Sequence, residues 1–213
     1  MAWIDYILYR SWRVGKDGKL FTMYKFRSMV RAADQLGGHS TALNDPRLTR
    51  LGRMMRRLKL DELPQLVNIL KGDMAFVGPR PEVPCYVNRM PDSEKNIVLS
   101  VKPGLVDYAS LYFINEDEIL EQAKAKGWQE EVYYLCIMKP WKTQLQVKYV
   151  REKSFRTDIK IILWTILLLS RSLFHFMKLC KASAPLKNPW LNPFCLGKSK
   201  PRYIFAPGRK LWR

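Results

Sequence analysis

The sequence is poor in the residues that most often build metal centres and disulfide frameworks. Its 213 residues include two histidines and four cysteines, and neither His39 nor His175 has a partner at metal-ligand spacing. The cysteines lack C-x-x-C spacing. A zinc site, a disulfide framework and histidine-centred catalysis are therefore not indicated, and a reducing environment fits best.

Long apolar runs are also scarce. The first ten residues place Asp5 inside a short apolar stretch without a small-residue cleavage site, so we expect no cleavable signal peptide. The longest apolar stretch, residues 159–177, is interrupted by Lys160, Arg171 and His175, whereas a spanning helix needs about 20 predominantly apolar residues. We predict a helix that lies on a membrane surface or against the core.

Acidic residues are the minority charge. The chain carries 37 Lys and Arg against 19 Asp and Glu, a formal net charge of +18. This excess favours polyanionic partners: nucleic acid, anionic lipid headgroups, or nucleotide and phosphate substrates. The length fits about one domain with appendages, large enough to bury a proper core.

The most informative feature is the adjacent pair Asp61 and Glu62. A basic stretch without acids, residues 47–59, precedes the pair, and an apolar run follows it. Pro64 is tolerated only in a helix's first turn, so we predict that a helix begins at the pair with Asp61 as its N-cap. Such a position would keep a nucleophilic or metal-binding carboxylate ionised. The alternative is that Asp61 only caps the helix and Glu62 only decorates its first turn.

Several cations stand beside rigid or regular backbone. Turn chemistry at residues 14–19 predicts a β-hairpin, whose second strand would project Lys25 and Arg27 from one face. Prolines on both sides of Arg80 restrict its backbone, which suits bidentate phosphate binding. Lys102 precedes a second Pro-Gly turn. The alternatives are a solvated strand face and an arginine that pins its own turn.

The rest of the chain is predicted more coarsely. We expect a loop over residues 30–46, a basic helix over 47–60, short strands near 74–77 and 101–105, and helices from 115 and over 133–150. The acids of the helix from 115 are predicted to form a solvated face. Residues 178–213 hold basic and aromatic residues, repeated prolines and no acid, and are predicted to be an irregular tail.

Six strings in this order and spacing resemble the bacterial sugar transferase family, the monotopic polyprenyl-phosphate phosphoglycosyl transferases. They are RVGKDG (13–18), KFRSM (25–29), LDELPQL (60–66), KGDM (71–74), VGPRP (77–81) and VKPG (101–104). The resemblance covers residues 13–177 and implies a compact, helix-rich α+β catalytic domain with a small β component. The domain would be monotopic and membrane-associated at the cytoplasmic face of the bacterial inner membrane.

The family transfers a sugar-1-phosphate from a UDP-sugar to undecaprenyl phosphate, which starts glycan assembly. The resemblance implies that Asp61 is the nucleophile that forms a phosphoryl-enzyme intermediate and that Glu62 binds Mg²⁺. Arg80, Lys25, Arg27 and Lys102 are the expected substrate-phosphate contacts. The expected partners are the UDP-sugar, undecaprenyl phosphate and the anionic inner leaflet, without nucleic acid; a homodimer is compatible with them.

Two departures from the family pattern qualify the resemblance. Family members begin with a strongly apolar re-entrant hairpin, to which only residues 1–12 could correspond, as a remnant. The segment 106–111 after the Lys-Pro-Gly turn also differs, so sugar or acceptor specificity should not be copied from other members. The alternatives are a truncated, inactive transferase and a basic nucleic-acid-binding protein.

Overall fold

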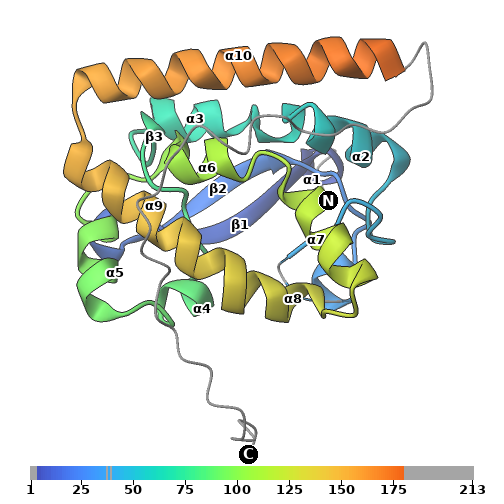
Figure 1. Cartoon of the computed structure of the whole chain (residues 1–213), viewed down its shortest axis with the longest axis horizontal. Helices are drawn as coiled ribbons and strands as arrows, with labels where there is room; N and C mark the ends of the chain where they lie inside the picture. Colours follow the sequence, from blue (N-terminus) through green and yellow to red (C-terminus); the bar gives the residue numbers. More distant parts are fainter. Residues whose placement is uncertain (1–3, 37, 39, 180–213) are drawn as a thin grey trace, which may run out of the picture. The chain divides into compact units, whose positions relative to one another are not determined.

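A computed structural model describes residues 4–36, 38 and 40–179 of the chain. In this part the predicted α+β class is confirmed: helices predominate, and the β component consists of two two-stranded sheets. Figure 1 shows the strands in the middle of the domain with helices on both sides. Residues 180–213, most of the predicted tail, lie outside the described residues.

The predicted hairpin is confirmed. Strand β1 (Leu8–Val14) pairs antiparallel with β2 (Leu20–Phe26), and the short 3-10 helix η1 (Lys16–Gly18) connects them. Asp17 and Gly18 both have positive φ, 57° and 77°, so the Asp-Gly pair supplies the left-handed backbone that this turn requires. The register opposes Tyr9 to Lys25, which fixes where Lys25 lies along the sheet.

The second sheet brings the Arg80 turn next to the Lys-Pro-Gly turn. Strand β3 (Ala75–Val77) pairs parallel with β4 (Gly104–Val106). At Gly78 a Cβ atom would lie 2.6 Å from the Lys102 carbonyl oxygen, so only glycine allows this close backbone approach.

Helices surround these sheets. The short helix α1 (Ile4–Ile7) precedes β1, and η2 (Ala33–Gln35) lies in the predicted loop. The other helices are α2 (Arg50–Arg57), η3 (Leu60–Glu62), α3 (Gln65–Leu70), α4 (Pro84–Val87), α5 (Asp92–Leu99), α6 (Tyr108–Tyr112), α7 (Glu116–Ala125), α8 (Glu130–Tyr133), the π-helical η4 (Tyr134–Met138), α9 (Lys139–Glu152) and α10 (Phe155–Leu179). The largest core cluster joins Tyr86, Phe113, Leu120, Met138 and Leu145.

The predicted helix start at Asp61 is wrong. Thr49 caps α2 by accepting a hydrogen bond from the Gly52 N–H, and the chain then turns at Lys59, which has φ 57°. Asp61 therefore lies inside the 3-10 turn η3, and Pro64 stands at the N-cap of α3. The left-handed conformation of Lys59 changes the direction of the chain between α2 and α3. The sequence pattern does not reveal this turn.

Buried Asn68 fastens α3 to the hairpin. Its side chain accepts a hydrogen bond from the Tyr24 N–H (3.1 Å) and donates one to the Thr22 carbonyl oxygen (2.7 Å), as a neighbouring strand would. The turn that holds Asp61 and Glu62 is thereby held against the strand that carries Lys25.

Helix α10 packs one face on the domain and exposes an apolar face. Ile161 is 1% exposed and packs with Val77 and Tyr149, whereas Leu163 and Ile166 are 55% and 57% exposed. The Tyr149 hydroxyl donates to Asp158 (2.9 Å), which ties α9 to α10. Among the described residues no helix combines the length and apolar character needed to cross a bilayer.

Candidate active site

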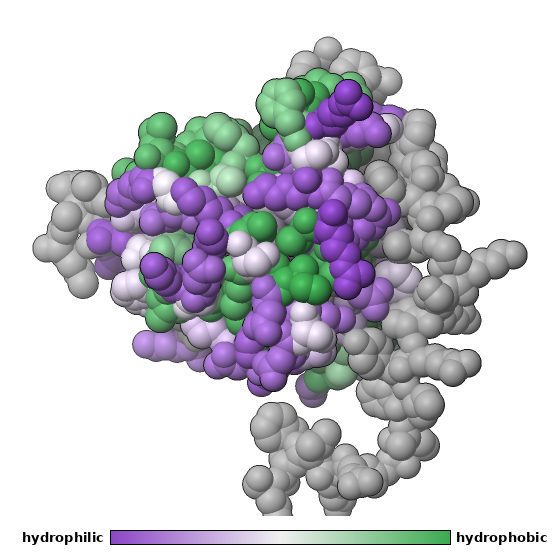
Figure 2. Space-filling view, turned by 90° about the vertical axis from the view of Figure 1, so that its left-hand side faces the viewer, coloured by the Kyte–Doolittle hydropathy of each residue, from purple (hydrophilic) through white to green (hydrophobic). Residues whose placement is uncertain are grey.

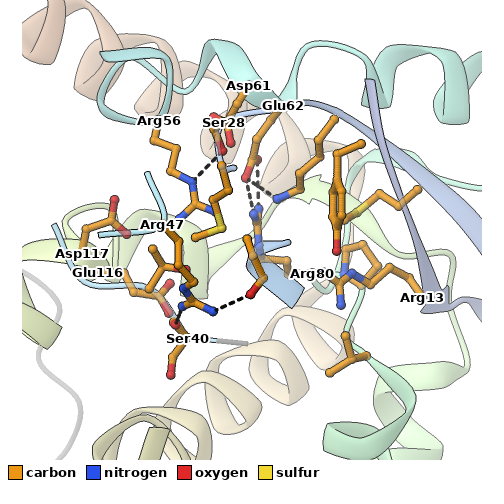
Figure 3. A pocket seen from close by; sticks show the side chains of 18 of the residues that line it. Arg13, Ser28, Ser40, Arg47, Arg56, Asp61, Glu62, Arg80, Glu116 and Asp117 are labelled. Carbon is orange, nitrogen blue, oxygen red and sulfur yellow. Dashed lines mark hydrogen bonds and ion pairs between the residues drawn. The ribbon is translucent and has the colours of Figure 1, made fainter. Parts of the chain in front are cut away.

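The carboxylate pair lies in a polar cavity of about 350 Å³. The hairpin, the loop before α2, η3, the Arg80 turn, α7 and α9 all contribute side chains to it. Figure 3 shows Asp61 and Glu62 next to each other on one wall, with Arg80 facing Glu62. A cavity of this size suits a nucleotide-sized ligand.

Asp61 is the carboxylate of the pair that has an unused hydrogen-bond acceptor. Its side chain is 5% exposed, and its Oδ1 atom is buried without a hydrogen-bond partner among the described residues. A buried acceptor without a partner loses its hydration and receives nothing in return, so such atoms are uncommon. The partnerless oxygen therefore leaves Asp61 with an acceptor that a ligand or ion can satisfy.

Glu62, in contrast, is paired with two cations. Both Nη atoms of Arg80 donate to its carboxylate, one at 3.1 Å, and Lys25 Nζ lies 3.2 Å from Oε1. Burial alone would raise the pKa of Glu62, but the charges of Arg80 and Lys25 outweigh it and hold the pKa well below its ordinary value. Burial lowers the pKa of Lys25 despite the nearby carboxylate, whereas the Glu62 charge raises the pKa of Arg80.

The fold holds Arg80 by its backbone. Its N–H donates to buried Asp107 (3.3 Å), and its carbonyl oxygen accepts from Gln146 (3.4 Å). Asp107 also caps α6 by accepting from the Ser110 N–H (2.7 Å). Burial raises the pKa of Asp107 although Ser110 and Arg80 favour its charged form. With prolines on both sides, the guanidinium is presented from a rigid base.

The structure brings Asp61, Glu62, Lys25, Arg27 and Arg80 together around one cavity. Arg27 donates to the Leu8 carbonyl oxygen (3.4 Å) and its guanidinium lies over the Tyr9 ring. Lys102 lines neither this cavity nor the one next to it, and it lies near Gly72 at another part of the domain. Its expected phosphate contact is thus not supported by its position.

Several residues that sequence reasoning missed also line the cavity. Glu116 was predicted to lie on a solvated face, but it faces the cavity and pairs with buried Lys142 of α9 at 2.6 Å. That prediction is wrong because the first turn of α7 faces the cavity. Arg13 lines the cavity with a buried Nε that no described residue accepts from, and burial lowers its pKa although Glu82 opposes this. The RVGKDG string could have indicated Arg13.

The donor set is compatible with a magnesium ion but does not form an all-protein cage. No group of three or more His, Cys, Asp and Glu side chains suited to a metal occurs in the described part of the chain. Mg²⁺ usually takes only one or two carboxylates and completes its octahedron with waters and substrate phosphates. The orphaned Asp61 oxygen beside the Glu62 carboxylate fits that demand.

A buried carboxylate pair surrounded by cations defines a site for an anionic, phosphate-bearing ligand. Comparison with known proteins then identifies the family: the model of the bacterial sugar transferase family matches residues 3–172. The chain belongs to this family.

Three relatives illustrate the similarity. UDP-glucose:undecaprenyl-phosphate glucose-1-phosphate transferase of Escherichia coli (strain K12) is 35% identical over 163 residues, 75% of this chain and 32% of the relative. The uncharacterized sugar transferase EpsL of Bacillus subtilis (strain 168) is 35% identical over 164 residues, 75% of this chain and 68% of EpsL. A putative undecaprenyl-phosphate N-acetylgalactosaminyl 1-phosphate transferase of the same strain is 50% identical over 82 residues, 38% of this chain and 46% of the relative. The chain thus spans less than half the length of the first and third relatives.

Proposed function

We propose that the chain transfers a sugar-1-phosphate from a UDP-sugar to undecaprenyl phosphate and so starts the assembly of a glycan such as an exopolysaccharide, an O-antigen or a glycoprotein glycan. Family membership and the activities for which the relatives are named support this reaction class. The single observation that carries it is the buried, partnerless Asp61 Oδ1 in a cavity lined with cations.

In the proposed reaction, an Asp61 carboxylate oxygen attacks the sugar-linked phosphorus of the donor. The bond from that phosphorus to the bridging oxygen breaks, UMP leaves, and the sugar phosphate stays on Asp61. A phosphate oxygen of the acceptor then attacks the same phosphorus, and the acyl-phosphate bond breaks to restore the Asp61 carboxylate. Covalent catalysis of this kind divides one difficult transfer into two easier ones.

Glu62 would hold a Mg²⁺ ion when the donor is bound, and the ion would neutralise charge on the diphosphate. Arg80, Lys25 and Arg27 are the proposed phosphate contacts, with Arg80 and Lys25 already next to Glu62. A cation that sits beside a carboxylate can exchange part of that contact for a phosphate oxygen, so these side chains would position the donor and stabilise the transition state.

We further propose that the domain docks on the cytoplasmic face of the bacterial inner membrane. Large apolar side chains are exposed on α3 and α10, the two helices along the upper side of the molecule in Figure 1, and Figure 2 shows apolar surface along that side. We call this the apolar face: Leu63, Leu66, Val67, Leu70, Ile159, Ile162, Leu163, Trp164, Ile166 and Leu167. The net charge of +18 complements an anionic leaflet.

The test is turnover of a UDP-sugar panel with Mg²⁺ and undecaprenyl phosphate in detergent or nanodiscs. We expect release of UMP with at least one donor, a sugar-phosphate adduct mapped to Asp61 by mass spectrometry, and loss of both on Mg²⁺ chelation. Asp61→Asn should abolish adduct and turnover, because an amide is not a nucleophile here. Turnover by Asp61→Asn would remove Asp61 from the mechanism, and an absence of UMP with every donor would reject the reaction.

A further inference from the structure

A second cavity adjoins the polar one and has a different chemistry. It measures about 200 Å³ and runs between the β4–α6 segment and α10. We call it the apolar groove, because its walls include Leu63, Leu105, Leu111, Phe113 and, from α10, Leu169. Leu63 belongs both to the groove wall and to the apolar face, so the groove adjoins the surface proposed to meet lipid.

The residues that line both cavities are charged. Every residue that lines both is ionisable: Lys59, Glu62, Arg80, Glu82, Glu116 and Lys142. Most of these charges are neutralised in pairs, Glu62 by Arg80 and Lys25, Glu116 by Lys142, and Glu82 by Lys139 at 2.7 Å. A ligand that carries an anionic head on an apolar chain would place its head at this junction.

Lys59 is the cation at the junction that remains unpaired. Its half-buried side chain makes no hydrogen bond or ion pair in the described part of the chain, and its charge acts on Glu62 and Asp117 without direct contact. Its backbone has φ 57° and ψ 19°, a conformation that glycine or asparagine adopts more easily than lysine. Strained backbone conformations of this kind are frequent at functional sites, where the side chain is needed for its chemistry.

We propose that Lys59 binds the phosphate of the polyprenyl phosphate acceptor at the junction, while the apolar groove holds the phosphate-proximal isoprene units. This inference rests on the proposed function and names the acceptor subsite within it. Charge complementarity selects the occupant, because a phosphate monoester needs a cation that other groups have not neutralised. The same position directs the acceptor phosphate toward the wall that carries Asp61 and Glu62.

Direct binding of undecaprenyl phosphate to the full chain in detergent micelles tests the proposal, with undecaprenol as the ligand that lacks the phosphate. Lys59→Asn removes the charge and suits the left-handed backbone. We expect it to keep or raise the melting temperature, to weaken undecaprenyl phosphate binding about tenfold and to leave undecaprenol binding unchanged. The matched control, Lys16→Met in the hairpin turn, removes a lysine that lines neither cavity and should change nothing.

The groove is tested on neighbouring residues of α10. Thr165 lines the groove, whereas Ile166 is exposed and does not. Thr165→Trp should fill the groove and weaken both undecaprenyl phosphate and undecaprenol, and Ile166→Trp should weaken neither. Wild-type affinity for undecaprenyl phosphate in Lys59→Asn would overturn the phosphate assignment, and unchanged binding in Thr165→Trp would overturn the groove assignment.

These outcomes are separable from those that test the proposed function. Suppose that the wild-type chain forms the adduct and releases UMP, but that Lys59→Asn binds undecaprenyl phosphate as well as wild type does. The proposed acceptor subsite would then be wrong, and the proposed reaction would stand. Lys59-dependent binding of undecaprenyl phosphate without UMP from any donor would reject the reaction and keep the subsite.

Discussion

The two neighbouring carboxylates differ because their surroundings differ. Asp61 keeps one oxygen without a partner, whereas Glu62 is held by Arg80 and Lys25. A nucleophile must be able to reach the reacting phosphorus, and a residue clamped by two cations is poorly placed to do so. The contact geometry is therefore compatible with the proposed attack by Asp61 and the proposed electrostatic role of Glu62.

The clamp on Glu62 makes a pH-dependent contribution to stability. Its pKa is lower in the folded chain than its ordinary value of 4.5, so its contribution is complete above that value and is lost as the pH falls toward the lowered pKa. We expect Glu62→Gln to cost about 2 kcal/mol near neutral pH, a buried-pair value reduced because Arg80 is partly exposed. Urea unfolding of both forms across the acidic range measures the difference.

The difference between wild type and Glu62→Gln should shrink as the pH falls below about 4.5, because the native carboxylate then becomes protonated. Glu94→Gln on α5, which lines neither cavity, is the control and should stay within about 0.5 kcal/mol of wild type. A difference that stays constant down to the acid limit would show that the glutamine affects packing rather than charge.

At this scale the sequence revealed the residues that occur in recognisable strings. Asp61, Glu62, Lys25, Arg27 and Arg80 belong to such strings and line the cavity, whereas Lys102 belongs to one and does not. The partners Glu116 and Lys142 belong to none, and their pairing joins positions far apart in the chain. A single sequence contains no signal for such a pair, because only the packing of α7 against the rest of the domain brings the two together.

At the scale of the elements, α2 packs directly against the backbone of the segment that follows β2. A Cβ atom on Gly52 would lie 1.8 Å from the Ser28 carbonyl oxygen, which also accepts hydrogen bonds from Thr49. The opposing wall is backbone and cannot rotate away. This contact places Ser28 where its hydroxyl accepts from Arg56 at 3.0 Å, beside the cavity.

Gly52→Ala should therefore destabilise the chain although alanine is the better helix former. Alanine gains about 1 kcal/mol of helix propensity, but overpacking against backbone costs up to about 3 kcal/mol or more, so we expect a net loss of about 2 kcal/mol. Thermal or urea unfolding gives the value. Arg50→Ala, exposed on the first turn of the same helix, should stay within about 0.5 kcal/mol of wild type, and equal stability of the two variants would contradict the contact.

The elements divide into those set by local chemistry and those set by packing. The hairpin was predictable because Asp17 and Gly18 form its turn within a few residues. The end of α2 and the 3-10 turn at Asp61 were not, because a lysine gives no sign that it will adopt a left-handed conformation. Local rules favoured Asp61 as an N-cap, and the tertiary turn at Lys59 overrode them.

At the scale of the whole molecule, the proposed membrane docking combines the apolar face with the positive charge. Hydrophobic contact and attraction to anionic headgroups add in membrane binding, so each should be visible in a partition experiment. The prediction of a helix against the core over residues 159–177 is confirmed, since Ile161 of α10 packs in the core, whereas contact of its exposed apolar side with a membrane stays a prediction. Periodicity alone could not say which side faces the core.

Leu163→Glu should weaken partitioning of the chain onto anionic phospholipid vesicles by at least about tenfold, because burial of one leucine side chain contributes roughly 1.5–3 kcal/mol. Vesicle co-flotation at low and high salt measures it. Val132→Glu introduces the same charge at an exposed valine of α8, away from the apolar face, and should have little effect. Equal losses for the two variants would mean that charge alone drives binding.

The arrangement of the two cavities along the chain bears on how the protein is made. The polar cavity is complete once Lys142 has been synthesised, whereas the apolar groove waits for Thr165 and Leu169. A nascent chain on the ribosome would therefore contain every residue that lines the polar cavity before it contains those that complete the groove. If the groove holds the lipid acceptor as proposed, the acceptor subsite is completed only when α10 has been made.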